Sequence, residues 1–221
     1  MRLPPTPEWQ IFGKSVRRRP REKRQRHRFQ RPDYAAIAGW VNVGSTVLDL
    51  GCGDGSLLRY LRDSRSTAGY GVEIDDERVL ACVKSGVNVI QGDLERGLSE
   101  FESRSFDYVV LSQTLQAVRN SERIVADMLR VGREGIVTFP NFGYWKNRLQ
   151  VIGGHMPVSD NLPYEWHDTP NIHLCTITDF ERFCSSHDVA ITERKVLTHG
   201  KAVSVLPNLL GSLAVYRFQR A

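Results

Sequence analysis

The 221-residue sequence has no long hydrophobic run, no internal repeat and no low-complexity tract. A membrane-spanning helix needs about 20 consecutive apolar residues, so we do not expect an integral membrane protein. The first residues, Met1 to Pro7, lack the continuous apolar stretch of a secretory signal, and we expect no export. The sequence therefore predicts a cytoplasmic protein.

Cysteine is scarce, and its spacing is not that of a metal or redox motif. The four cysteines are Cys52, Cys82, Cys175 and Cys184, with no Cys-x-x-Cys pair. Reduced thiols are the expectation for such a chain in the cytoplasm. A zinc site made of Cys175, Cys184 and either His173 or His187 is an alternative, but the spacings fit no usual ligand frame. We expect no bound metal.

Acidic residues are nearly absent from one segment, which carries most of the positive charge. Residues 14–31 hold ten Lys or Arg and one acid, Glu22, whereas residues 32–221 are mildly acidic. This segment has too few large apolar residues to offset the entropy cost of ordering the chain. Residues 1–31 are therefore predicted to form a disordered tail. Binding to the phosphates of nucleic acid or anionic lipid, and organelle targeting, are the alternatives to a solvated tail.

From Pro32 onward, short apolar runs alternate with amphipathic stretches, which is the rhythm of βαβ units. Strands are predicted at 46–50, 69–74, 87–90, 106–111, 135–139, 190–196 and 213–218. Helices are predicted at 33–41, 56–63 and 122–131, in a stretch through Val83 capped by Asp75 or Asp76, and in a stretch capped by Thr178 through Phe183. The pattern predicts an α/β domain over residues 32–221, with a doubly wound, seven-stranded, mostly parallel sheet.

A glycine turn follows the first predicted strand, in the order strand, turn, helix that a nucleotide loop requires. Its sequence is Gly51-Cys-Gly-Asp-Gly55 rather than the Gly-x-Gly-x-x-Gly spacing that suits a pyrophosphate. Asp54 would place a negative charge where a phosphate sits. S-adenosylmethionine fits better, because it has no phosphate and carries a sulfonium and an ammonium group.

Three acids lie at or just after the carboxyl ends of three successive strands, where ligands of parallel sheets bind. Asp49 can face the positive groups of the cofactor, Glu73 can accept hydrogen bonds from both ribose hydroxyls, and Asp93 can accept one from the adenine amino group. Each acid alone could be a turn or surface residue. Their order along the chain favours a shared site for S-adenosylmethionine or S-adenosylhomocysteine.

These residues give the chain its resemblance to known families. Val47–Gly55, Gly71–Glu73 and Gly92–Leu94 resemble the class I S-adenosylmethionine-dependent methyltransferases, which implies a Rossmann-like sheet of that type. On this basis we expect the cofactor to contact Asp49, Gly51, Cys52, Gly53, Asp54, Gly55, Glu73, Ile74, Asp93, Leu94 and Ser112.

Five further motifs are similar to the MetW family of methionine biosynthesis proteins. They are Tyr108–Val118, Phe139–Gly143, Leu162–Trp166, Asp168–Cys175 and Leu206–Gly211, within a resemblance that runs from about Arg31 to the C-terminus. The resemblance implies a role in methionine synthesis beside MetX, a homoserine O-acyltransferase that such proteins accompany and support. It does not cover the basic tail.

Whether the chain transfers a methyl group is left open by its residues. Gln116 stands where small-molecule relatives often offer a histidine base, and glutamine cannot take a proton at neutral pH. His167 and His173 are the candidate catalytic residues, within a segment, residues 142–173, rich in aromatic and titratable side chains. That composition suits a binding pocket or a docking surface.

Two functions remain, and neither needs a membrane. One is a subunit that binds S-adenosylmethionine and activates the acyltransferase, with residues 142–173 in contact with that enzyme. The other is an active methyltransferase for an unidentified small molecule. Methylation of nucleic acid is a distant third, because Phe139-Pro-Asn-Phe142 has neither the order nor the position of a base-amino catalytic motif.

Overall fold

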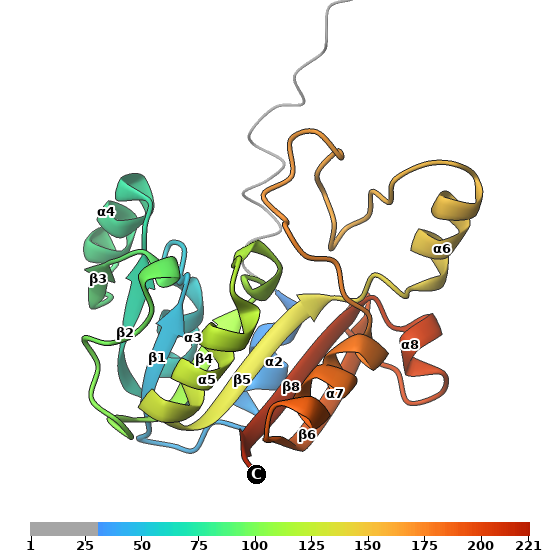
Figure 1. Ribbon diagram of the computed structural model, residues 1–221. Helices are drawn as coiled ribbons and strands as arrows, with labels where there is room; N and C mark the ends of the chain where they lie inside the picture. Colours follow the sequence, from blue (N-terminus) through green and yellow to red (C-terminus); the bar gives the residue numbers. More distant parts are fainter. Residues whose placement is uncertain (1–30) are drawn as a thin grey trace, which may run out of the picture. The chain divides into compact units, whose positions relative to one another are not determined.

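The computed structural model describes residues 31–221, which form one α/β unit (Figure 1). A single sheet runs through this unit in the order β3-β2-β1-β4-β5-β8-β6-β7. Its strands are β1 (Thr46–Leu50), β2 (Ala68–Glu73), β3 (Val89–Gln91), β4 (Phe106–Ser112), β5 (Gly132–Pro140), β6 (Val189–Thr198), β7 (Lys201–Ala202) and β8 (Leu213–Arg220).

The sheet is mostly parallel, as the sequence predicts. Strands β1 to β5 pair in parallel, whereas β8 runs antiparallel between β5 and β6. The expected number of strands was wrong by one. The eighth strand, β7, is a two-residue partner of β6, formed where His199 and Gly200 turn the chain with positive φ angles. So short a hairpin leaves no alternating pattern in the sequence.

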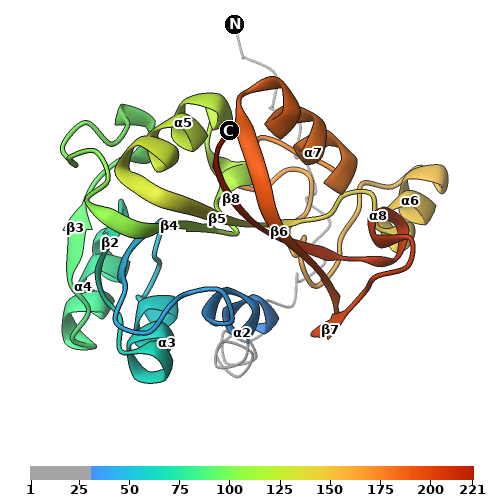
Figure 2. The same cartoon turned by 90° about the horizontal axis from the view of Figure 1, so that it is seen from below.

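Helices cover both faces of the sheet. Figure 2 shows α2 and α3 on one face and α5 and α7 on the other. The helices are α2 (Pro32–Ala38), α3 (Ser56–Arg65), α4 (Asp76–Lys84), α5 (Ser121–Val131), α6 (Trp145–Ile152), α7 (Ile177–Ser186) and α8 (Pro207–Leu210), with 3-10 turns η1 (Leu94–Arg96) and η2 (Leu115–Ala117). Pro32 occupies the first position of α2, where its missing N–H costs nothing.

Two hydrophobic cores lie on opposite faces, because alternate side chains of a strand point to opposite sides. In β4, Val109 and Leu111 enter the core beneath α5 and α7, whereas Tyr108 and Val110 enter the core beneath α2 and α3. All four side chains are buried. This double coverage explains why the central strands read as continuous apolar runs.

The cap of α7 differs from the one predicted. Thr176, not Thr178, is the N-cap, since its hydroxyl accepts a hydrogen bond from the Asp179 N–H. The Asp179 carboxylate accepts the Thr176 N–H in return, at 3.0 Å, which completes a capping box. The pattern Thr176-x-x-Asp179 carries this signal, because the reciprocal bond needs an acid three residues after the cap.

The predicted tail, residues 1–31, lies almost entirely outside the described residues. Arg31 is its one described member, and it belongs to the folded unit. None of the helices within residues 31–221 combines the length and apolarity that crossing a bilayer requires.

Candidate functional site

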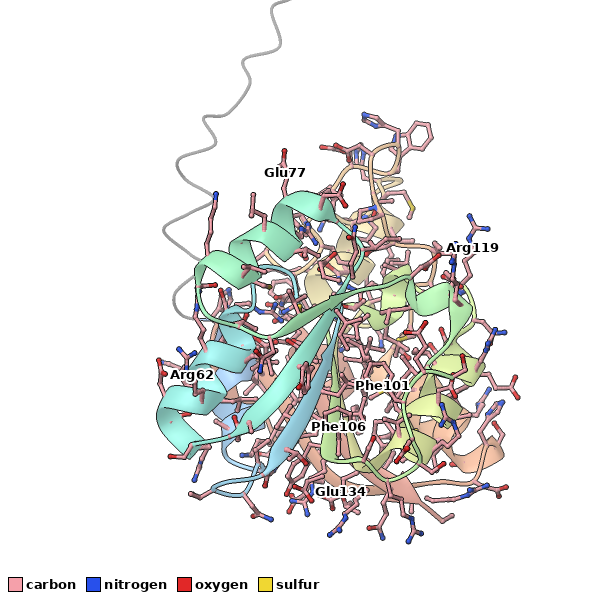
Figure 3. The ribbon with its side chains drawn as sticks, turned by 90° about the vertical axis from the view of Figure 1, so that its left-hand side faces the viewer. Arg62, Glu77, Phe101, Phe106, Arg119 and Glu134 are labelled. Atoms are coloured by element: carbon pink, nitrogen blue, oxygen red, sulfur yellow. The ribbon has the colours of Figure 1, made fainter. Side chains whose placement is uncertain are left out.

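The carboxyl ends of β1, β2 and β4 bring the predicted acids to one edge of the sheet. Asp49 is aligned with Gly71 of β2 and with Val110 of β4, so Glu73 and Ser112 each lie two residues further toward this edge. All three side chains are buried. Figure 3 shows this edge at the top, with Glu77 of α4 beside it, and Glu134 at the opposite, amino edge.

The glycine turn after β1 is built from three left-handed residues. The φ angles of Gly51, Gly53 and Gly55 are 69°, 61° and 73°. A side chain on Gly51 would meet Thr114 at 2.8 Å, and one on Gly55 would meet Val87 at 2.9 Å. At Gly53 a Cβ would meet nothing within 4 Å. Gly53 is therefore where the turn leaves open space for a ligand to approach the backbone.

Glu73 holds this turn against the end of β2. Its Oε2 accepts the Gly53 N–H at 2.8 Å, and its Oε1 accepts the N–H groups of Ile74 and Asp75 at 3.0 and 3.1 Å. Arg78 lies 3.9 Å from Oε2. Each carboxylate oxygen has two lone pairs, so Glu73 keeps capacity to accept from a further donor.

Asp49 is the most unusual polar group of the site. Only 2% of the residue is exposed, and its Oδ1 has no hydrogen-bond partner among the residues that the structure describes. Burial, with repulsion from Asp33 and Glu73, raises the pKa of Asp49 to about 7, although Arg31 acts in the opposite direction. A buried acceptor without a donor is costly and calls for an explanation.

A buried ionic network that sequence reasoning missed lies next to Asp49. The carboxylate of Asp33, fully buried in α2, accepts hydrogen bonds from Arg31, from Ser112 at 2.9 Å and from Thr138 at 3.2 Å. The Arg31 guanidinium also donates to the Ser112 hydroxyl at 2.6 Å and lies 4.8 Å from the centre of the Tyr34 ring.

Charge and burial compete in this network. Burial alone would lower the pKa of Arg31, but the charge and hydrogen bonds of Asp33 raise it above its ordinary value. The sequence offered one signal, the order Arg31-Pro-Asp33 at the start of a helix. It was obscured because Arg31 reads as the last residue of the basic tract.

Cys52 and Asp54, also expected at the cofactor, make local contacts within the glycine turn. The Cys52 thiol is buried 3.8 Å from the sulfur of Cys82 on α4, and the Cys52 N–H donates to the Val72 carbonyl. Burial is the main cause that raises the pKa of both thiols, and it keeps them protonated. Asp54 accepts from the Ser56 hydroxyl at 2.5 Å at the start of α3.

The predicted adenine-side residues lie after β2 and β3. Ile74 is exposed and free to cover one face of a ring. Asp93 is half-buried and caps η1 by accepting the Glu95 N–H at 2.9 Å, while Leu94 packs against the core beneath α5. The structure thus brings Ile74, Asp93 and Leu94 to the same end of the sheet as Glu73.

The two candidate catalytic histidines are exposed, on the segment that crosses above this edge (Figure 1). His173 donates from Nε2 to the Arg119 carbonyl at 3.0 Å, and its backbone N–H donates to the Gln116 carbonyl at 3.0 Å. His167 contacts the ring of Trp166. His173 therefore fastens the segment to the loop after β4, whereas His167 has no such anchoring contact in residues 31–221.

Gln116 and Asn141 also clarify what this edge can do. The side-chain oxygen of Gln116 is buried without a partner from residues 31–221, and its amide donates to the Gln113 carbonyl at 2.8 Å. Asn141 is fully buried, with its amide and carbonyl bonded to the backbone of Asn208, Gly211, Gly143 and Ile177. Asn141 is thus a structural tie between α6, α7 and α8, in keeping with the lack of a base-amino motif.

Two shallow surface depressions lie at the amino edge, away from these residues. Arg104, Arg130, Arg133 and Arg220 contribute to the first, and Asp107 and Arg217 to the second. Over the described range, no three His, Cys, Asp or Glu side chains come together in a way that could hold a metal ion.

Comparison with known families agrees with this geometry. Residues 31–218 match the family model described as methionine biosynthesis protein MetW. The chain belongs to the MetW family. This MetW-family chain is also 39% identical, over 202 residues, to the bifunctional methionine biosynthesis protein MetXA/MetW of Rhodopirellula baltica. The match covers 85% of the chain but only 32% of that relative, so the chain spans about a third of its length.

Solved structures place the MetW-family fold among methyltransferases. One similar chain comes from the complex between the Haloferax volcanii Trm112 methyltransferase activator and a methyltransferase (TM-score 0.66, 16% identity, 90% of this chain and 93% of that one). Another is the magnesium protoporphyrin IX methyltransferase of Synechocystis with bound S-adenosylhomocysteine (TM-score 0.60, 16% identity, 86% and 82%). At such low identity the likeness establishes the fold, which is that of the class I methyltransferases.

Proposed function

We propose that the protein is a cytoplasmic S-adenosylmethionine-binding subunit that supports or activates a homoserine O-acyltransferase of the MetX type in methionine synthesis. The observation that carries the proposal is the MetXA/MetW relative, in which both names belong to one chain. Two proteins whose relatives are fused act close together. S-adenosylmethionine lies downstream of methionine, so the subunit would report the supply of the route's product to its acyltransferase.

The carboxyl edge supports cofactor binding through its charges. The unpaired, buried Oδ1 of Asp49 suits a cationic ligand, because an ammonium or sulfonium would supply the missing positive charge. Glu73 would accept the ribose hydroxyls and Asp93 the adenine amino group, next to the open space at Gly53. A pyrophosphate would instead meet Asp33, Asp49 and Glu73, three buried acids.

Exposed apolar side chains support the contact with a protein partner. Twelve of the eighteen large hydrophobic residues that are exposed in the described chain belong to α6, to the segment up to residue 174 and to the stretch around α8. We name these parts the α6–α8 apolar segments. In Figures 1 and 2, α6 and α8 lie together at one end of the sheet, and Figure 1 shows the segment after α6 running from there above the carboxyl edge. Among them, Ile152 is 81% exposed and Trp166 is 72% exposed. Such concentrations mark interaction sites, and we assign this one to the acyltransferase.

A second candidate function, methyl transfer to a small molecule, rests on Gln116. Its unpaired, buried side-chain oxygen lies in the loop after β4, whose Gln116 carbonyl accepts the N–H groups of Ile172 and His173 at the end of the segment 142–173. It could accept a hydrogen bond from a substrate hydroxyl or amine and orient it. It cannot act as a general base, so the reaction would need an acceptor that ionises readily or a base from His167 or His173.

One experiment separates the two functions. The full chain is incubated with methyl-labelled S-adenosylmethionine, homoserine and acyl donors, with and without the acyltransferase, and both label transfer and homoserine acylation are followed. A subunit is expected to change the acylation rate with no label transferred, and its effect is expected to depend on the cofactor concentration. Transfer of label without the acyltransferase would support the enzyme instead.

A further inference from the structure

Arg31 places a positive charge inside an otherwise acidic site. Its side chain is 30% exposed, and of the charges around Asp49 it has the largest effect, ahead of Asp33 and Glu73. Its guanidinium lies on the Tyr34 ring and reaches Ser112 at the end of β4. Arg31 therefore stands at the same strand ends as the proposed cofactor site, although it precedes the first helix.

Part of this guanidinium makes no hydrogen bond within residues 31–221. Nε and Nη2 donate to the Asp33 carboxylate, and Nη2 also donates to Ser112, but Nη1 donates to no acceptor within residues 31–221. Arginine has five donors in a planar fork, and a carboxylate can take two of them at once. Asp33 fixes the position of the fork and leaves the N–H groups of Nη1 available on one edge of it.

The chemistry of the ligand indicates what that edge would bind. This step rests on the proposed function, in which Asp49 faces the positive groups of S-adenosylmethionine. The ammonium and carboxylate of an α-amino acid are attached to one carbon, so their partners must be neighbours. A carboxylate next to Asp49, Asp33 and Glu73 would be strongly repelled unless a cation were beside it.

We propose that Arg31 binds the α-carboxylate of the amino-acid end of the cofactor and makes the site specific for ligands that retain it. Asp33, Ser112 and Tyr34 position the guanidinium, and Asp49 takes the ammonium on its other side. S-adenosylmethionine and S-adenosylhomocysteine both meet this requirement. Decarboxylated S-adenosylmethionine keeps the sulfonium, the amine and the nucleoside but lacks the carboxylate.

The test compares these two ligands on the full chain by titration calorimetry. The unmodified protein is expected to bind S-adenosylmethionine about tenfold or more tightly than its decarboxylated form, as for a charge-assisted pair. Arg31→Gln is expected to remove this preference by weakening the first ligand alone. Arg31→Lys, which keeps the charge without the fork, is expected to show an intermediate preference, and circular dichroism melts establish that both variants fold.

Arg78→Gln is the matched control, because Arg78 lies beside Glu73 at the ribose end. It is expected to leave the ratio of the two affinities unchanged. Equal affinity of the unmodified protein for both ligands would overturn the role of Arg31 while leaving cofactor binding in place, as would an Arg31→Gln variant that weakens both ligands equally. Binding of neither ligand would overturn the proposed function itself.

Discussion

At the scale of single residues, the protonation of Asp49 controls what the carboxyl edge can hold. Burial, then repulsion from Asp33 and Glu73, raises its pKa from 3.8 to about 7, so the side chain changes charge near neutral pH. The unpaired oxygen is tolerated because the protonated acid carries no charge. A bound cation would favour the ionised form, which couples ligand binding to release of a proton.

We therefore expect the stability of the ligand-free protein to depend on Asp49. Because the folded pKa is the higher one, its contribution is fully present below pH 3.8 and is lost as the pH rises to about 7. The loss in free energy of unfolding is on the order of 4 kcal/mol. Urea unfolding at a series of pH values measures it, and Asp49→Asn, which does not ionise, should lack this component. Parallel pH profiles of the two proteins would contradict the prediction.

The affinity for S-adenosylmethionine should show the opposite trend. It is expected to rise as the pH increases toward about 7, since ionised Asp49 attracts the ligand, and then to level off. Calorimetry in two buffers of different ionisation enthalpy would detect the released proton. In Asp49→Asn that proton signal should disappear.

In the proposed site, Glu73 would contribute to binding in two ways, through the ligand and through the glycine turn. Glu73→Ala removes the acceptor of the Gly53 N–H and the predicted acceptor of the ribose hydroxyls. We expect the binding free energy of S-adenosylhomocysteine to weaken by about 1–3 kcal/mol. Glu77→Ala is the control, because Glu77 is an exposed acid in the first turn of α4. Equal affinities of the two variants would place the ligand elsewhere.

The sequence was informative for residues whose role follows from their position in a strand–turn–helix unit. Asp49, Gly53 and Glu73 were predicted in this way to lie near one another, and the structure brings them to one edge of the sheet. Arg31 and Asp33 could not, because their contacts with Ser112 and Thr138 bridge about 80 and 105 positions. No local pattern records a contact over that distance.

At the scale of elements, the first turn of α7 depends on its capping box. We expect Thr176→Ala to lower the free energy of unfolding by about 1 kcal/mol, since it leaves the Asp179 N–H without its acceptor. Thr178→Ala loses only an exposed hydrogen bond from Asn208 and should cost less. Urea unfolding compares the two. A larger loss for Thr178→Ala would indicate that Thr178 is the N-cap, as the sequence first predicted.

The elements that sequence patterns identified are those with a clear period or a long apolar run. The predictions for strands β1 and β4 and for helices α3 and α5 lie close to the observed bounds. Helices α6 and α8 did not, because α6 buries only Asn147 and α8 buries no residue. A helix that leaves most of its apolar side chains exposed has no amphipathic signature of the usual kind.

At the scale of the whole molecule, the α6–α8 apolar segments should bind the acyltransferase independently of the cofactor site. We expect Ile152→Glu and Trp166→Glu each to weaken that complex by about tenfold, because a charge would be buried in an apolar contact. Sedimentation of the mixed proteins measures the complex. Affinity for S-adenosylhomocysteine should not change.

The matched control for these variants is Val83→Glu. Val83 is 62% exposed on α4, which lies at the opposite end of the folded unit from α6 (Figure 1). It is expected to leave the complex intact. Loss of the complex in all three variants would indicate a general effect of added charge, and retention in all three would remove the acyltransferase from this surface.

The position of β8 has a consequence for how the protein is made. The last strand, Leu213–Arg220, lies between β5 and β6, and its residues from Leu213 to Tyr216 are buried. Both neighbours precede β8 in the sequence, so they are synthesised before the strand that joins them. Until β8 enters the sheet, the facing edges of β5 and β6 are unpaired and are open to misassembly.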